Sequence, residues 1–222
     1  MTATPTACLL IIGNEVLSGR TQDANLAHIA RKLGERGIAL REARVIPDVP
    51  ETIIGTVNEV RQKFAHVLTT GGIGPTHDDI TADCIAKAFG VGIDYHPRAL
   101  ADMKASYDRR GVEMTPARMR MARIPDGGEL VENKISIAPG FKVGNVIVMA
   151  GIPNIMQVML DAVTPTLRTG RKMMSETVEL FRPEGEIADL FSAHQQEFPG
   201  VSMGSYPFVR DQKTFGTHLV LR

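Results

Sequence analysis

Apolar runs alternate with segments of helical periodicity along the first part of the chain. The continuous run at residues 7–12 predicts a strand covered on both faces, and residues 38–46 alternate apolar and charged positions like a half-exposed strand. Residues 65–70 predict a third strand. Between the strands, apolar residues recur at spacings of three and four, from Leu26 to Leu33 and from Ile53 to Val60, which is typical of helices. This order predicts βαβ units and a mostly parallel sheet.

Two amphipathic helices are predicted next, one through Leu100 and Tyr107 and one at residues 114–122. The region also contains five scattered arginines, which are Arg109, Arg110, Arg118, Arg120 and Arg123. One interpretation is a solvated helical hairpin with charged outer faces. The other is that one or two of these guanidinium groups bind a ligand phosphate as bidentate donors. The sequence does not select between them.

The middle of the chain predicts short β segments. They are a strand at 129–131, a second strand at 134–137 that pairs with it in a hairpin-like excursion around Asn133, a turn at 139–141, and an apolar strand at 145–149. A helix through Met156, Met159, Leu160 and Val163 follows.

The composition changes near residues 169–171, and we place a domain boundary there, with one domain at 1–169 and a second at 170–222. The second domain predicts a strand at 178–181, a helix at 184–197, and strands at 201–206 and 217–221. Ile187, Leu190 and Phe191 are expected to face inward from the helix.

Composition limits the partners of the protein. The formal net charge of zero removes any bulk electrostatic argument for nucleic acid or membrane binding, and aromatic residues make up only 5% of the 222 residues, so stacking platforms for bases are scarce. No apolar run approaches the roughly 20 residues of a membrane span, and the start of the chain lacks a basic region. We therefore expect a cytoplasmic protein without nucleic acid or membrane partners. Cys8 and Cys84 are expected to be small core residues.

The stretch Thr-Thr-Gly-Gly-Ile-Gly-Pro-Thr-His-Asp-Asp-Ile-Thr, at residues 69–81, is a loop that follows a strand and precedes a helix. Gly71, Gly72 and Gly74 let backbone N–H groups approach a phosphate, and the next helix directs its amino terminus at the same anion. Asp78 and Asp79 would repel a phosphate unless a divalent cation such as Mg²⁺ lies between them. The alternative is that one aspartate caps the helix and the glycines form a tight turn.

Acidic residues and glycines also follow other strands. The loop after residue 12 contains Gly13, Glu15 and Ser18, and either Asp23 or Asn25 is expected to cap the next helix. Asp48 has two interpretations, as a third acidic contact to the site or as a turn residue. His77 is more often an exposed or hydrogen-bonding residue than a general base or metal ligand when no second histidine is near.

The 69–81 stretch resembles the signature of the molybdopterin-binding fold, which is shared by molybdenum-cofactor biosynthesis proteins, the amino-terminal domain of the CinA-type competence/damage-inducible family, and a domain of FAD synthase. The resemblance implies a three-layer α/β/α domain followed by a small KH-like α+β domain. It also implies that the Glu15 and Ser18 loop, the glycine loop, and Gly151 with Pro153 enclose one pocket. Ala150 departs from the common pattern, in which a proline is usual, and Asn154 stands where CinA-type relatives often have glutamate.

The site residues implied in this way fall into three groups. The ligand or phosphate is expected at Gly13, Ser18, Gly71, Gly72, Gly74, Thr76, Thr81, Gly151 and Pro153. A divalent metal, Mg²⁺ or a similar ion, is expected at Glu15, Asp78 and Asp79. Asp79 and Asp78 are the expected catalytic residues, with Asp79 the more important of the two.

The activity that the resemblance implies is metal-dependent hydrolysis of a nucleotide diphosphate bond, as in ADP-ribose or FAD. One alternative is molybdopterin binding or adenylylation, with molybdopterin as the ligand, and another is a non-catalytic module that binds a nucleotide or pterin. The RNA-binding Gly-x-x-Gly clamp of KH domains is not evident, and neither is the amidase domain of full-length CinA proteins, so we do not expect those activities. A homo-oligomer, with a dimer favoured, is expected.

Overall fold

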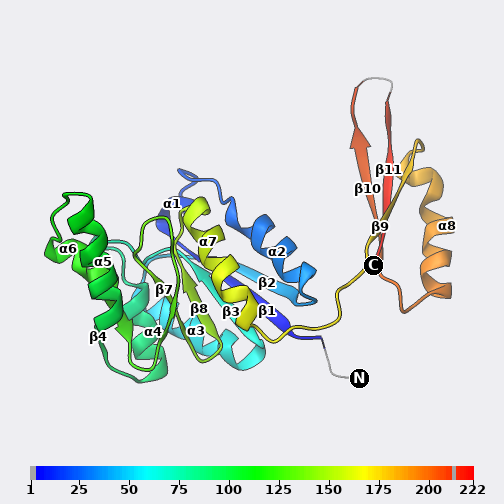
Figure 1. The fold of residues 1–222 in the computed structure, drawn as a ribbon. Helices are drawn as coiled ribbons and strands as arrows, with labels where there is room; N and C mark the ends of the chain where they lie inside the picture. Colours follow the sequence, from blue (N-terminus) through cyan, green and yellow to red (C-terminus); the bar gives the residue numbers. More distant parts are fainter. Residues whose placement is uncertain (1–3, 212–213) are drawn as a thin grey trace. The chain divides into compact units, whose positions relative to one another are not determined.

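The computed structural model describes residues 4–211 and 214–222. The chain divides into two compact units, Met1–Arg171 and Lys172–Arg222, which are described separately (Figure 1). No helix in the described part of the chain is long and apolar enough to cross a membrane.

A six-stranded sheet in the order β2-β1-β3-β8-β7-β6 forms the centre of the first unit. Its strands are β1 (Thr6–Ile12), β2 (Ala39–Ile46), β3 (His66–Thr70), β6 (Glu129–Val131), β7 (Gly140–Val143) and β8 (Val146–Met149). The first four strands of this order are parallel. At one edge, β7 runs antiparallel to β8, and β6 runs antiparallel to β7. The expected mostly parallel sheet is confirmed.

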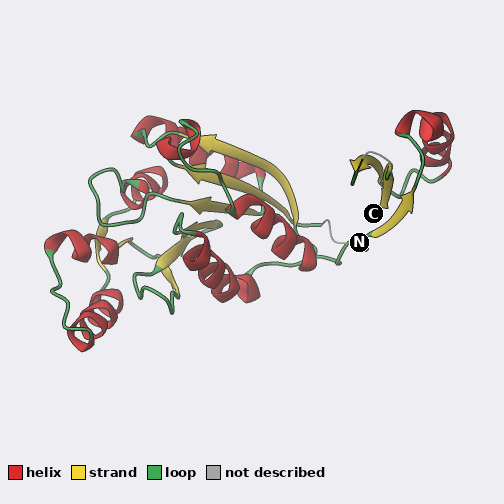
Figure 2. Cartoon of the chain, turned by 90° about the horizontal axis from the view of Figure 1, so that it is seen from above, coloured by secondary structure: helices red, strands yellow, loops and turns green. Residues whose placement is uncertain are grey.

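Helices cover both faces of this sheet, as Figure 2 shows. The helices α2 (Asn25–Glu35) and α7 (Pro153–Val163) pack on one face, and α3 (Pro50–Lys63) and α4 (Thr81–Phe89) pack on the other. Alternate residues of each central strand enter the two cores, so that Leu9 and Leu68 meet α2 and α7 while Leu10 and Val67 meet α3 and α4. The three-layer architecture is therefore confirmed.

The region between residues 93 and 125 forms a small lobe with its own core of Ala99, Met103 and Ala122. Its elements are β4 (Ile93–Tyr95), α5 (Pro97–Arg109), α6 (Pro116–Met119), the 3-10 helix η1 (Arg120–Ala122) and β5 (Arg123–Pro125), with β4 and β5 paired. The second predicted helix is thus a short α-helix followed by a 3-10 turn.

Two predictions near Asn133 are wrong. Residues 134–136 form a turn and Ile137 has no regular structure, while the partner of β6 is β7, which begins at Gly140 where a turn was expected. The Asn133 side chain explains the difference, because its amide nitrogen donates to Ser136 Oγ and the Ala138 carbonyl, while its oxygen accepts from two backbone N–H groups. These local bonds replace a strand ladder.

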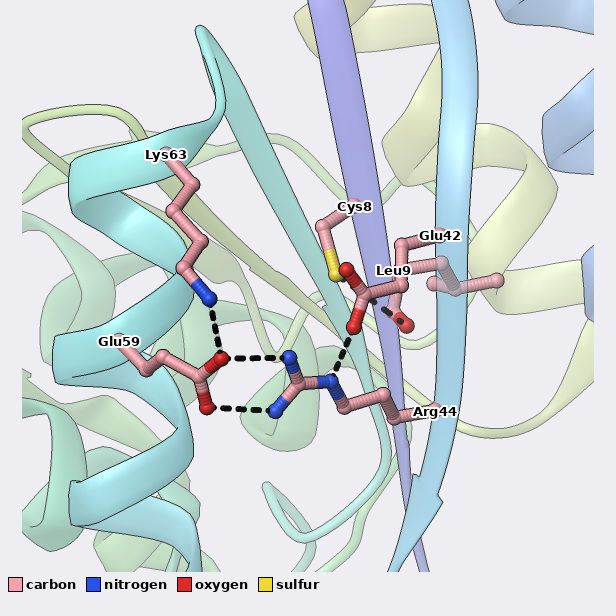
Figure 3. Close-up of polar contacts among 6 residues, drawn as sticks. All are labelled: Cys8, Leu9, Glu42, Arg44, Glu59 and Lys63. Carbon is pink, nitrogen blue, oxygen red and sulfur yellow. Dashed lines mark hydrogen bonds and ion pairs between the residues drawn. The ribbon is translucent and has the colours of Figure 1, made fainter.

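Two further short helices complete the first unit, α1 (Asn14–Leu17) and the 3-10 helix η2 (Thr164–Thr166). The edge strand β2 is tied to α3 by ion pairs on its outer side (Figure 3). The Arg44 guanidinium donates to both Glu59 oxygens at 2.8 and 2.9 Å and also to Glu42, and Lys63 donates to Glu59. These bonds lower the pKa of Glu59 to about 2, with Arg44 as the main cause. Beneath them, burial raises the pKa of Cys8 to about 11.

The second unit contains β9 (Glu176–Leu180), α8 (Glu184–Glu197), β10 (Met203–Val209) and β11 (Phe215–Leu221), with an antiparallel sheet in the order β10-β11-β9. Ile187 and Phe191 are half-buried, but Leu190 is 76% exposed, so its expected inward position is wrong. A three-stranded sheet covers only a narrow stripe of the helix, and no residue of α8 is fully buried.

Candidate functional site

Three loops meet at the carboxyl ends of β1, β3 and β8, because these strands are parallel neighbours. The Gly71 N–H donates to the Met149 carbonyl at 3.1 Å, which joins the loop after β3 to the end of β8. Gly71 has φ +101°, and a Cβ there would lie 2.1 Å from the Ile12 carbonyl oxygen. Only glycine allows the three chain segments to approach this closely.

A cavity of about 540 Å³ lies between these loops. Glu15 of the first loop, Gly71 to Pro75 and Asp79 of the second, and Ala150 to Pro153 of the third all line it. Of the expected site residues, the structure therefore brings together Glu15, Gly71, Gly72, Gly74, Asp79, Gly151 and Pro153. Gly13, Ser18, Thr76, Asp78 and Thr81 do not line this cavity.

Thr81 holds the glycine loop in place through two hydrogen bonds. Its hydroxyl donates to the Gly71 carbonyl at 3.0 Å, and its N–H donates to the Gly72 carbonyl at 3.0 Å. Gly72 has φ +68°, and a Cβ there would lie 2.1 Å from the Thr81 hydroxyl. Because Thr81 is fully buried and its hydroxyl is already used, it supports the loop without facing the cavity.

Asp79 closes the second half of the loop. Its Oδ2 accepts hydrogen bonds from the Thr76 N–H at 2.8 Å and from the Thr76 hydroxyl, and a Cβ at Gly74 would lie 2.6 Å from the same oxygen. The helix α4 begins two residues later with no side-chain cap. The alternative in which an aspartate caps this helix is therefore wrong, since the carboxylate of Asp79 bonds back into the loop.

Asp78 and His77 face solvent. The Asp78 carboxylate lies within hydrogen-bond distance of the same Thr76 hydroxyl, whose single proton is shared with Asp79, and this contact is the main cause of the lowered pKa of Asp78. The His77 side chain is 97% exposed, and its ring nitrogen lies 3.9 Å from the Asp78 carboxylate. The two adjacent aspartates thus occupy different environments, and only Asp79 reaches the cavity.

The loop after β1, which contains Glu15, is fixed by hydrogen bonds that do not involve the cavity. Asp48 Oδ2 accepts from the Asn14 N–H at 2.8 Å, so Asp48 positions α1 and does not line the cavity. Ser18 is exposed and donates to the Glu15 carbonyl at 3.2 Å, and the buried Gly13 N–H donates to the Ile46 carbonyl at 3.1 Å. These residues shape the loop that presents Glu15.

Neither expected residue occupies the cap position of α2, which is Ala24, but Asp23 Oδ2 accepts from the Leu26 N–H of its first turn at 2.9 Å. Asn25 has a different contact. Its amide nitrogen donates to the Gly151 carbonyl at 2.8 Å, across 126 positions of sequence. The first and third loops are therefore joined directly.

Several cavity residues were missed by the sequence analysis. Met121 comes from η1, and Asn133, Ser136 and Ala138 come from the turns after β6. The position of Asn133 two residues after a predicted strand was a signal for these residues, but the assignment of residues 134–137 to a second strand concealed it.

Among the five arginines, Arg120 has a hydrogen bond to the glycine loop, from Nη2 to the Asp79 carbonyl at a long 3.5 Å. Arg123 forms a bidentate pair with Asp83 at 2.8 and 2.9 Å. Arg118 lies over the Tyr107 ring and donates to the Glu113 carbonyl. Arg120 and Arg123 both lie near the glycine loop, because both line a narrow hollow with Gly72, Gly74 and Asp79, but neither lines the main cavity.

A cage of three protein ligands for a metal ion is not formed by histidine, cysteine, aspartate or glutamate side chains within residues 4–211 and 214–222. Glu15 and Asp79 nevertheless line the same cavity. Magnesium is commonly held by one or two carboxylates together with substrate phosphates. The residues present fit that arrangement, with the ligand supplying the remaining oxygens.

Comparison with known families agrees with the fold. A family model described as a probable molybdopterin binding domain matches residues 8–169. A second model, the middle domain of FAD synthase, matches residues 172–222.

Individual relatives support the same assignment. A protein of Aeropyrum pernix is 33% identical over 212 residues, which are 91% of this chain and 79% of that protein. A CinA-like protein of Desulfosudis oleivorans is 34% identical over 207 residues, which are 88% of this chain and 50% of that protein. The crystal structure of CinA from Thermoplasma acidophilum, a protein of unknown function, has a TM-score of 0.68 and 33% identity over 73% of this chain and 98% of that chain. The chain therefore belongs to the molybdopterin-binding domain family and is a CinA-type member of it.

Proposed function

We propose that the first unit binds the diphosphate of a nucleotide such as ADP-ribose or FAD and hydrolyses it with the help of a divalent metal ion. The observation that carries this proposal is the cavity of about 540 Å³, where a glycine loop and the carboxylates of Glu15 and Asp79 line the same space. Glycine N–H groups favour an anion, whereas carboxylates favour a cation. A metal-bound diphosphate satisfies both.

The glycine loop would bind the phosphate oxygens. Gly72 and Gly74 expose backbone without side chains, and α4 begins directly after the loop, so the positive end of its dipole would favour an anion there. Arg120 lies beside Asp79 and would neutralise part of the phosphate charge. These fixed donors would also stabilise the charge that develops in the transition state.

The carboxylates of Glu15 and Asp79 would act on the metal ion and on the attacking water. No hydrogen bond to the Glu15 carboxylate occurs within residues 4–211 and 214–222. Both of its oxygens are therefore available to bind a metal ion or to accept a proton from the attacking water. A bound metal would polarise the phosphoryl oxygen. Water would form the new P–O bond, the bridging P–O bond would break, and the products would be two monophosphates.

A second candidate function is molybdopterin binding or adenylylation. It is favoured by the match of residues 8–169 to a probable molybdopterin binding domain. Ile152, Ile155 and Met159 give the cavity an apolar wall on which a pterin ring could pack. A binding module without catalysis would use the same contacts.

Turnover of ADP-ribose, FAD, NAD and ATP with Mg²⁺, Co²⁺ or chelator tests the proposal. Metal-dependent release of a mononucleotide, at least 100-fold slower in Glu15→Gln, would support a hydrolase. Asp161→Asn is the matched control, because Asp161 pairs with Lys32 on the surface and does not line the cavity.

Two other results would separate the alternatives. A nucleotide that raises the melting temperature without any turnover would leave a binding module. No binding of the nucleotides, combined with binding of molybdopterin, would overturn the nucleotide proposal in favour of the cofactor one.

A further inference from the structure

A second, smaller cavity lies next to the main one, between the first loop and Gly151. It has a volume of about 60 Å³ and shares Glu15, Thr21, Gly151 and Pro153 with the main cavity. About 10 to 15 Å³ is enough to hold one water molecule. The space is therefore large enough for a small polar group of a ligand that occupies the main cavity.

Two residues that line this small cavity have a buried side-chain oxygen without a hydrogen-bond partner within the described residues. These atoms are Oδ1 of Asn25 and Oγ1 of Thr70. Asn25 is 4% exposed and Thr70 is 1% exposed. An unpaired buried polar atom costs free energy that a suitable occupant would recover.

The hydrogen bond of Asn25 determines which kind of group fits. Its amide nitrogen donates to the Gly151 carbonyl at 2.8 Å, so the amide orientation is fixed and Oδ1 can only accept. The Thr70 hydroxyl can donate or accept. An occupant must therefore offer a hydrogen-bond donor, which excludes an ionised phosphate or carboxylate.

We propose that this small cavity is a subsite for a hydroxyl or amino group of the ligand, with Asn25 Oδ1 accepting from that group and Thr70 Oγ1 completing the contact. The inference rests on the proposed nucleotide site but not on hydrolysis. Two parts of the ligand would then bind at two places. The phosphate would bind at the glycine loop, and a neutral hydrogen-bond donor would bind between β1, β3 and Gly151. Thr70 and Asn25 are then specificity-determining residues.

Thr69 offers a matched control on the same strand. Its Oγ1 is also buried without a partner in the described part of the chain, and the residue is fully buried. Side chains alternate along a strand, so Thr69 lies on the face of Val67, toward α3 and α4, whereas Thr70 lies on the face of Leu68, toward α2 and α7. Thr69 does not line the small cavity.

The experiment compares wild type, Thr70→Val, Thr69→Val and Thr70→Ser. Melting temperature is measured without ligand, and calorimetry gives Kd for two probes with Mg²⁺, ADP-ribose and inorganic diphosphate. Both valine variants should melt a few degrees higher without ligand, because each removes an unpaired buried hydroxyl. Thr70→Val alone should bind ADP-ribose about tenfold more weakly, the typical value of one hydrogen bond. Thr70→Ser should retain the wild-type affinity, and diphosphate should bind all four proteins equally.

An ADP-ribose affinity that is unchanged in Thr70→Val would overturn the subsite and identify the small cavity as a place for water only, with the proposed function intact. An equal loss in Thr69→Val would overturn it as well, because the loss would then come from the strand as a whole. Failure of ADP-ribose and diphosphate to bind wild type would contradict the nucleotide function itself and this subsite with it.

Discussion

The hydroxyl of Thr81 donates a hydrogen bond to the carbonyl of Gly71 at 3.0 Å, so the first turn of α4 holds the first residue of the glycine loop. Gly71 lines the cavity, whereas Thr81 does not. Thr81 thus acts on loop shape, whereas the backbone it holds lines the cavity.

Thr81→Val is expected to loosen the loop, because it removes this bond and leaves the Gly71 carbonyl without its side-chain donor. We expect a loss of about 1 to 2 kcal/mol in unfolding free energy and weaker ADP-ribose binding in calorimetry. Thr81→Ser keeps the hydroxyl and should restore binding. Equal affinities in wild type and Thr81→Val would show that the bond does not control the loop.

Asp79→Asn is expected to separate binding from turnover. An asparagine oxygen can still accept from Thr76, so the loop should persist, while the charge that faces the cavity is lost. We expect Kd for ADP-ribose to change by less than about fivefold and turnover to fall by at least about 100-fold. Unchanged turnover, measured by release of mononucleotide, would exclude a catalytic role for Asp79.

Asp78→Asn is expected to have little effect, in contrast to the sequence-based expectation that both aspartates bind metal. The side chain is exposed and lies outside the cavity. We expect turnover and Kd within about threefold of wild type, as for other exposed substitutions. A loss as large as that of Asp79→Asn would show that the loop rearranges when ligand binds.

Asn133→Ala is expected to destabilise the first unit by about 2 to 3 kcal/mol, because it removes four hydrogen bonds of a buried side chain. Urea unfolding followed by circular dichroism measures this. The control is Asn154→Ala, whose side chain is exposed on α7. Similar midpoints for the two variants would contradict a structural role for Asn133.

The ion pairs between β2 and α3 should make the stability of the first unit depend on pH. The pKa of Glu59 falls from its ordinary 4.5 to about 2 in the folded protein. A carboxyl group with a lowered folded pKa stabilises the protein above its unfolded pKa, and this contribution is lost as pH falls from about 4.5 to about 2. Glu59→Gln should therefore flatten the dependence of melting temperature on pH in that window. Identical profiles for variant and wild type would show that solvent screens the pairs.

The local pattern of apolar and polar residues determined most strands and helices of the first unit. Strands β1, β2 and β3 and helices α2, α3, α4 and α7 follow from hydrophobic spacing, because each buries one face or both in a layered core. The glycine loop was also visible, since three glycines between a buried strand and a helix have few structural alternatives. The resemblance to the molybdopterin-binding family rested on the same short stretch.

The tertiary structure alone decided which polar groups face the cavity. Asp78 and Asp79 are neighbours in sequence and both contact Thr76, yet only Asp79 lines the cavity. Asn25 resembles a helix cap in sequence, but it bonds to Gly151 because parallel strands bring their distant loops together. Asn133 closes its own turn in place of a strand. Hydrophobic spacing is a local property of the chain, whereas these contacts join residues that become neighbours only after the sheet has formed.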